Sequence, residues 1–161
     1  MKNQSKMKRS DVEKLSHILS CNDFKYNKCS RETRIKLIRI QILVDPVAKA
    51  MKETREQVET KCMSWKLRKY LEKYQGGKLE KEDVPEFNTL YKAYDEAYCT
   101  AIAPALDEKI PVAIDKLTES QYDELFDSNV DWMAGDVPKF LYLSLVGESL
   151  GESAFDEKSD R

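Results

Sequence analysis

The apolar residues of the chain recur mostly at the three- and four-residue spacings of helices. One such stripe predicts a short helix over about 10–20. It consists of Val12, Leu15, Ile18 and Leu19. Ser10 and Glu13 have the spacing of a capping box, which we expect to start this helix. The preceding residues are polar and basic, so we expect 1–9 to be a disordered leader.

The main predicted element is a long helix over about 31–75, which Ser30 caps. Its stripe is Ile35, Ile38, Ile42, Val44, Val47, Met51, Val58, Cys62 and Trp65. Pro46 has no backbone N–H to donate, so we expect it to kink or divide this helix. Gly76 and Gly77 should end it, because glycine tolerates the left-handed conformation at a helix C-terminus.

A second long helix is predicted over about 85–107, with Pro85 in its first turn. Its stripe is Phe87, Leu90, Tyr91, Tyr94, Tyr98, Ile102 and Leu106. The two long helices, joined by a polar turn, predict an antiparallel hairpin over about 31–107. We expect the tyrosines to cover the 62–74 end of the first helix, and Pro104 to distort the last turn of the second.

The remaining residues predict a small helical cap over about 108–146. A short extended segment starts it, because apolar residues alternate around Pro111, which limits the segment to a sheet edge. Thr118 and Gln121 form a second capping box, which predicts a helix over 119–128. The run KFLYLSLV after Pro138 predicts a short buried helix, with a strand as the alternative. The fold class is therefore mainly α, as a single domain over 10–146, followed by a disordered acidic tail over 147–161.

Composition agrees with a helical domain. Of 161 residues, 41% are hydrophobic and 35% are charged, which excludes wholesale disorder. Five Gly and five Pro are too few for a fold of many short strands. The chain has no run of about 18 apolar residues, so we expect no membrane contact and a cytoplasmic protein.

Charge is distributed unevenly along the chain. Residues 1–75 hold 19 Lys and Arg against 9 Asp and Glu, whereas residues 76–161 hold 8 against 20. This asymmetry indicates either that the two halves face each other or that the basic half meets an acidic partner.

The sequence carries no recognisable catalytic motif. Its only histidine, His17, has no GxSxG motif to support it, and no phosphate-binding glycine loop occurs. A zinc site is the alternative, since His17 and Cys21 share a helix face, with Cys29 and Cys62 as further ligands. However, Cys29 follows Cys21 by eight residues and no CxxC occurs. We therefore expect no enzyme, no small-molecule substrate, no metal and no other cofactor.

Two surfaces are candidates for binding. Basic residues open and close the long predicted helix, with aromatic residues between them, as nucleic-acid binding requires. They are Arg31, Arg34, Arg39, Lys66, Lys69 and Lys73. Tyr91, Tyr94, Tyr98 and Trp65 are a predicted docking stripe, because a two-helix hairpin cannot bury every side of both helices. Packing within the hairpin is the alternative role for these tyrosines.

The order of elements adds a resemblance. A short capped helix, then FKYNKCSRETRIKLIRI opening a long helix, then PEFNTLYKAYDEA, and finally IPVAIDKL before TESQYDELFDS resembles small uncharacterised helical proteins of tailed bacteriophages over about 10–146. The resemblance implies a role in the virion or its assembly, in the host cytoplasm or the particle. We therefore predict a non-enzymatic protein-interaction or assembly component that binds another protein or itself. The alternative is a nucleic-acid-binding protein that uses the basic long helix, and a weaker third is an enzyme or metal protein centred on His17.

Overall fold

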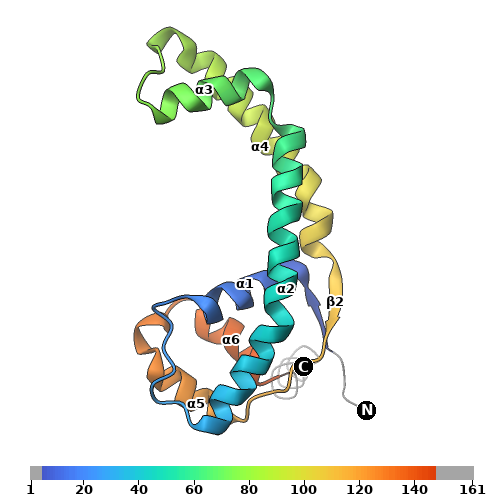
Figure 1. Ribbon diagram of the computed structural model, residues 1–161, viewed down its shortest axis with the longest axis vertical. Coiled ribbons are helices and arrows are strands. Elements are labelled where there is room, and N and C mark those ends of the chain that lie inside the picture. The colour runs from blue at the N-terminus through green and yellow to red at the C-terminus, as the bar shows by residue number, and fades with distance from the viewer. Residues whose placement is uncertain (1–4, 148–161) are drawn as a thin grey trace, which may run out of the picture. The chain divides into compact units, whose positions relative to one another are not determined.

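The computed structural model describes residues 5–147, which fold as helices joined by short loops, with one two-stranded sheet (Figure 1). The fold is mainly α, with a long antiparallel helical hairpin, as predicted. The chain divides into two compact units. The larger unit comprises the residues up to Ala48 and those from Lys109 onward, and the hairpin unit is Lys49–Glu108. The sequence predicted one domain over 10–146, whereas this division falls inside the first long helix.

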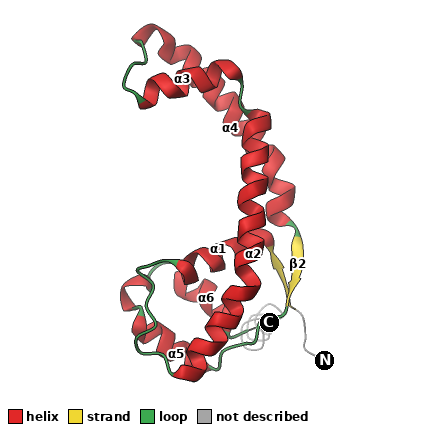
Figure 2. Ribbon diagram, viewed as in Figure 1, coloured by secondary structure: helices red, strands yellow, loops and turns green. Residues whose placement is uncertain are grey.

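A short sheet opens the larger unit. Strand β1 (Ser5–Lys8) pairs antiparallel with β2 (Lys109–Val112), with Ser5 opposite Val112 and Lys8 opposite Lys109 (Figure 2). The predicted extended segment is therefore confirmed over part of its length. The prediction of a disordered leader over 1–9 is wrong for 5–8, because β2, about a hundred residues later in the chain, pairs with them. Residues 1–4 lie outside the described part.

Helix α1 (Arg9–Ser20) follows β1 directly. Its N-cap residue is Lys8, which makes no side-chain capping hydrogen bond, so the predicted capping box at Ser10 is wrong. The strand runs straight into the helix and leaves Ser10 inside the first turn. The predicted apolar stripe of this helix is buried, as expected.

Helix α2 (Arg31–Cys62) continues through Pro46, and the chain breaks later, before α3 (Trp65–Gln75). The predicted single helix over 31–75 is therefore divided, though not at the proline. Pro46 has no N–H to donate to the carbonyl four residues earlier, which belongs to the exposed residue Ile42. Ser64 caps α3 instead, since its Oγ accepts the Leu67 N–H at 3.1 Å.

The hairpin turn follows the predicted pattern. Gly77 adopts a φ of 67°, and the Lys78 N–H donates to the Lys73 carbonyl at 2.7 Å, as in a Schellman motif. A 3₁₀ helix, η1 (Lys81–Asp83), leads into α4 (Val84–Asp107), which has a proline in its first turn as expected. α4 continues through Pro104 to its end, so the predicted distortion of its last turn does not interrupt the helix.

The C-terminal part of the larger unit is helical. α5 (Glu119–Ser128) has the predicted capping box in full, a 3₁₀ helix η2 (Val130–Trp132) follows, and α6 (Val137–Leu145) is a helix rather than the alternative strand. Of the predicted acidic tail, residues 148–161 lie outside the described part.

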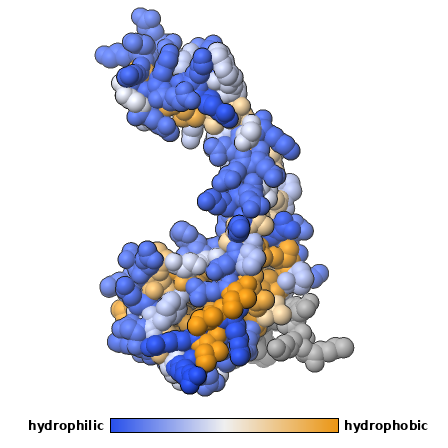
Figure 3. All heavy atoms as spheres, in the orientation of Figure 1, coloured by the Kyte–Doolittle hydropathy of each residue, from blue (hydrophilic) through white to orange (hydrophobic). Residues whose placement is uncertain are grey.

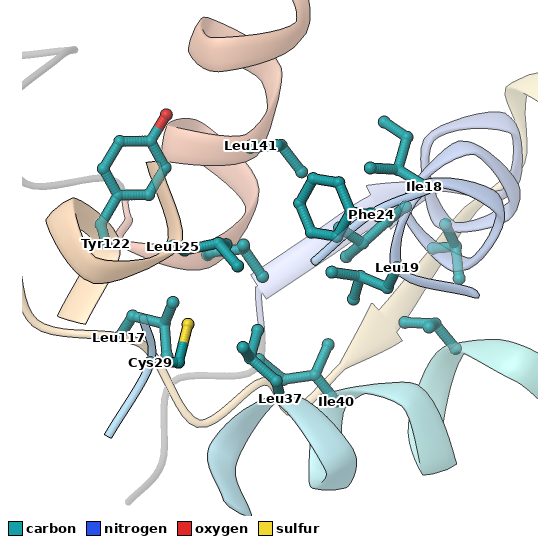
Figure 4. Close-up of a cluster of buried hydrophobic side chains, with 14 of the residues drawn as sticks. Ile18, Leu19, Phe24, Cys29, Leu37, Ile40, Leu117, Tyr122, Leu125 and Leu141 are labelled. Carbon is teal, nitrogen blue, oxygen red and sulfur yellow. The ribbon is translucent and has the colours of Figure 1, made fainter. Parts of the chain in front are cut away.

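One hydrophobic core holds the larger unit together, and Figure 4 shows side chains of α1, α2, α5 and α6 meeting in it. Its buried members are Val12, Leu15, Ile18, Leu19, Phe24, Cys29, Leu37, Ile40, Val44, Val112, Leu117, Tyr122, Leu125, Leu141 and Leu145. Polar groups inside it are hydrogen-bonded. The Asn129 side chain, for example, accepts the Lys25 N–H at 2.6 Å and donates to the carbonyls of Lys25 and Leu125 at 2.7 and 3.0 Å.

The apolar stripe predicted for the long helix is buried at Val44 and Met51 but not at its first three isoleucines. Leu37, Ile40 and Val44 are buried, whereas Ile35, Ile38 and Ile42 are exposed. Both sets recur at helical spacing, so this part of α2 carries two apolar stripes on different sides. Periodicity alone does not say which of two such stripes faces the core.

Candidate interaction surface

The exposed apolar residues of α2 form the most distinct surface feature of the larger unit. Four large aliphatic side chains, which we call the isoleucine stripe, expose 38%, 54%, 67% and 42% of their surface. They are Ile35, Ile38, Ile42 and Leu43. In Figure 3 an orange band follows the lower part of α2. Large contiguous apolar patches are uncommon on monomeric proteins in water and often mark binding sites.

Three predicted basic residues border this stripe. Arg31 and Arg39 lie four residues before and after Ile35, and Arg34 lies four residues before Ile38, so all are neighbours of the stripe on the helix surface. The Arg34 Nε donates to the Cys29 carbonyl at 3.0 Å. Arg31 and Arg39 have no ion-pair partner among residues 5–147. Their charges are therefore available to a ligand of this face.

Polar contacts on the other side of α2 hold the stripe on a fixed helix. The Thr33 hydroxyl donates to Glu124 Oε2 at 2.6 Å, and the Ser30 N–H donates to the same oxygen at 3.0 Å. These hydrogen bonds hold the pKa of the Glu124 carboxyl below its usual value. The Lys36 ammonium donates to the Lys116 carbonyl at 3.1 Å and to Gln121 Oε1 at 3.0 Å. Because α2 is fastened to α5 and its preceding loop, its outer side chains are pre-positioned for binding.

The predicted tyrosine docking stripe lies on α4 in the hairpin unit. The rings of Tyr91, Tyr94 and Tyr98 follow one another, with centroids 6.1 and 6.0 Å apart. Tyr94 and Tyr98 are half-buried, and Tyr91 is 46% exposed. Burial, and then the negative charge of Glu59 on α2, raise the pKa of Tyr94, while the Tyr98 hydroxyl accepts from Arg55 of α2 at 3.5 Å. Most of this row packs within the hairpin, and Tyr91 is its exposed member.

Trp65 is not part of that tyrosine row. It lies on α3, is 71% exposed, and has the Lys69 ammonium 4.1 Å from its ring centroid. The ring contacts found among the described residues do not join it to the tyrosines of α4. The structure therefore divides the predicted docking stripe into two separate features.

The predicted basic patch is also divided. Its arginines belong to the larger unit and its lysines to the hairpin unit. Lys66 forms an ion pair with Glu86 of α4, which raises the pKa of Lys66, and Tyr70 donates its hydroxyl to the same carboxylate at 2.8 Å. Lys69 lies over the Trp65 ring. Of the three predicted lysines, Lys73 is therefore the one that takes part in neither the ion pair nor the ring contact, and it is exposed.

The residues weighed for zinc are not gathered at one site. His17 is exposed on α1, Cys21 is half-buried, and Cys62 belongs to the hairpin unit. Cys29 is buried with its Sγ 3.7 Å from the Ser128 hydroxyl, and burial raises its pKa. In the described part of the chain, no three His, Cys, Asp or Glu side chains lie close enough together to hold a metal ion.

The isoleucine stripe as a surface and the contacts of Asn129 were not predicted from the sequence. Ile35, Ile38 and Ile42 were predicted as part of the apolar stripe of the long helix but not as a binding surface, and nothing in the sequence around Asn129 marks its contacts with a loop some hundred residues earlier. None of the helices within residues 5–147 is both long enough and apolar enough to cross a membrane. Comparisons with protein-family models, with curated proteins and with solved structures find no match to this chain, so its likeness to phage proteins stays a prediction.

Proposed function

We propose that the protein is a non-enzymatic protein-interaction or assembly component, and that the isoleucine stripe of α2 is the surface through which it acts. The observation that carries this proposal is the exposure of four large aliphatic side chains on one face of a helix that is otherwise fastened to the core. Burying apolar surface contributes about 25 cal/mol per Å², so covering this stripe favours association. The resemblance to tailed-phage proteins makes a virion or assembly factor the corresponding biological role.

Nucleic-acid binding has weaker support. Single-stranded nucleic acids bind where cations adjoin aromatic side chains on which bases can stack. The predicted arginines of α2 instead alternate with isoleucines, and two of the three lysines predicted for the basic patch, Lys66 and Lys69, engage neighbouring side chains. The exposed surface of α2 therefore fits a protein partner better than a phosphate backbone.

The proposal can be tested by asking which proteins associate with the full chain through this stripe. We would express tagged protein in the cells that encode it, crosslink, purify and quantify the associated proteins by mass spectrometry. The variant carries Ile38→Asp and Ile42→Asp together. Val130→Asp is the matched control, because Val130 is also exposed in the larger unit but does not lie on α2. We expect a defined partner to be retained by the control and depleted roughly tenfold by the double variant, a difference of about 1.4 kcal/mol in binding.

Circular dichroism and thermal melting should show that both variants remain folded, since exposed substitutions change stability little. Sedimentation across protein concentrations would reveal self-association through the same stripe, which the proposal also includes. If neither a second protein nor a second copy depends on Ile38 and Ile42, the proposed function is wrong.

A further inference from the structure

The isoleucine stripe and its arginines lie in two neighbouring rows along the outer face of α2. Residues four apart are neighbours on a helix surface. One row is Arg31, Ile35, Arg39 and Leu43, and the adjacent row is Arg34, Ile38 and Ile42. Such rows are the ridges between which side chains of a second helix pack. Each row thus offers both an apolar contact and a cationic one.

Charge on this face is predominantly positive. Between Arg31 and Ala48, α2 carries three arginines and Lys36 against Glu32 and Asp45. Lys36 is drawn towards α5 by its hydrogen bonds, and Asp45 accepts from the Ser16 hydroxyl at 2.7 Å. The arginines therefore dominate the field beside the isoleucines. Guanidinium groups bind carboxylates through paired, charge-assisted hydrogen bonds.

Symmetric pairing of two copies through this face is disfavoured by the same charges. A two-fold interface brings the same patch of both copies together, so two positively charged faces would meet. Repulsion between faces of like charge weakens such pairing. The occupant should instead carry carboxylates beside its apolar residues.

The backbone of α2 also limits the form of the occupant. Inside a helix the N–H and C=O groups bond to one another, so α2 has no strand edge to which an extended peptide could add. Binding must then use side chains alone, and an amphipathic helix presents its side chains at the matching three- and four-residue spacing. We propose, resting on the function proposed above, that the isoleucine stripe binds an acidic amphipathic helix of another protein.

The test uses two synthetic fluorescein-labelled peptides of about 20 residues, long enough to form helix. Both carry Leu at the same three- and four-residue spacings, and they differ only in having Glu or Lys at the positions that flank the leucines. Fluorescence anisotropy against the full chain should show at least roughly tenfold tighter binding of the Glu peptide, with affinity that falls as salt is raised. Ile38→Asp should weaken binding of the Glu peptide, and Val130→Asp should not.

A charge reversal separates recognition from simple loss of fold. The Arg31→Glu, Arg39→Glu double variant should prefer the Lys peptide, an exchange of specificity that an unfolded or merely weakened protein would not show. Equal binding of both peptides, or an unchanged preference after the reversal, would overturn the inference. Partners whose capture depends on Ile38 and Ile42 would in that case still support the proposed function.

Two further outcomes would assign the stripe to a different occupant. Concentration-dependent dimers that Ile38→Asp abolishes would show that a second copy covers it. A synthetic peptide of residues 148–161 that displaces the labelled Glu peptide at a lower concentration than unlabelled Glu peptide does would show that the C-terminal segment of this chain covers the stripe. Either result replaces the acidic partner helix.

Discussion

The two units of the molecule bury apolar surface to very different extents. The larger unit gathers residues of α1, α2, β2, α5 and α6 into one core, in which many side chains have almost no contact with solvent. Within the hairpin unit, the buried hydrophobic residues are Met51, Leu67, Tyr70 and Ile102. The same helix, α2, contributes to both units.

This difference indicates that the two units are stabilised by different interactions. A pair of helices can cover one side of each, so the hairpin unit depends more on its ring contacts and on surface ion pairs such as Lys66–Glu86. Surface ion pairs contribute little to stability, because solvent and salt screen them. Segments with few buried contacts open locally at lower free energy than the core does. We therefore expect the hairpin unit to open while the larger unit remains folded.

The largest predicted effect comes from two substitutions in α2, one in each unit, that each remove a buried side chain and leave a cavity. Leu37 and Met51 are each 1% exposed, and Leu37→Ala and Met51→Ala should each cost about 2–5 kcal/mol locally. Leu37→Ala should lower the free energy of unfolding of the larger unit, measured by denaturant titration. Met51→Ala should speed hydrogen exchange within residues 49–108 and leave the amides of α5 and α6 protected. Faster exchange throughout both units after Met51→Ala would mean that they unfold as one, and the comparison would fail.

A smaller loss is expected at Asn129, which has no counterpart in the hairpin unit. Its buried side chain makes three hydrogen bonds that tie the loop after α1 to the end of α5. Asn129→Ala leaves the Lys25 N–H and the two carbonyls without this partner, at a cost of about 1–3 kcal/mol. Thermal melting measures the loss, and Asn27→Ala, at an exposed position in the same loop, is the control. Equal melting temperatures for the two variants would show that this tie does not stabilise the larger unit.

The features that were predicted correctly are those fixed by neighbours in sequence. Thr118 and Gln121 cap a helix within one turn of themselves, and Gly77 needs only its own left-handed φ to end another. The periodicity of Phe87 to Ile102 defined α4 because one face of that helix meets one partner. Each of these signals is complete within a few residues, so the sequence alone specifies it.

The features that were missed depend on residues far apart in the chain. β1 forms only because β2 lies about a hundred residues later, so the sequence of 5–8 alone looked like a polar leader. The isoleucine stripe was not predicted as a surface for a similar reason. Ile35, Ile38 and Ile42 have the spacing of a core stripe, and only the positions of α1, α5 and α6 determine that Leu37 and Ile40 occupy the core instead.

Each unit has one helix whose N-cap side chain can be removed, at an expected cost of about 1 kcal/mol in stability. Thr118 caps α5 through a complete capping box, whereas Ser64 caps α3 by accepting one N–H. Thr118→Ala and Ser64→Ala should each cost about 0.5–2 kcal/mol, with Thr118 nearer the upper value. Denaturant unfolding should register the Thr118 change, and hydrogen exchange in residues 65–75 should register the Ser64 change. A larger effect for Ser64→Ala on unfolding of the whole chain would contradict the lower stability assigned to the hairpin unit.

The smallest predicted effect concerns the pKa of one carboxylate in each unit, Glu124 in the larger unit and Glu86 in the hairpin unit, whose ionised forms are stabilised in different ways. The pKa values of both Glu124 and Glu86 are lowered from 4.5, so each carboxylate stabilises the fold above that pH and loses this contribution as pH falls through its lowered value. For Glu124 the main causes are hydrogen bonds from the Thr33 hydroxyl and the Ser30 N–H. For Glu86 the first cause is the Lys66 ammonium, followed by the Tyr70 hydroxyl.

Salt should separate these two causes. Interactions between exposed charges are screened at high ionic strength, whereas short hydrogen bonds from neutral donors are not. Carbon-detected NMR titration of the carboxylates at low and high salt should therefore show the pKa of Glu86 rising towards its usual value and that of Glu124 staying low. Lys66→Met should raise the pKa of Glu86, as salt does, and leave that of Glu124 unchanged. Thr33→Val should raise the pKa of Glu124 and leave that of Glu86 unchanged. If salt raises both pKa values equally, the attachment of α2 to α5 depends on long-range charge rather than on Thr33, and the two units would hold their carboxylates in the same way.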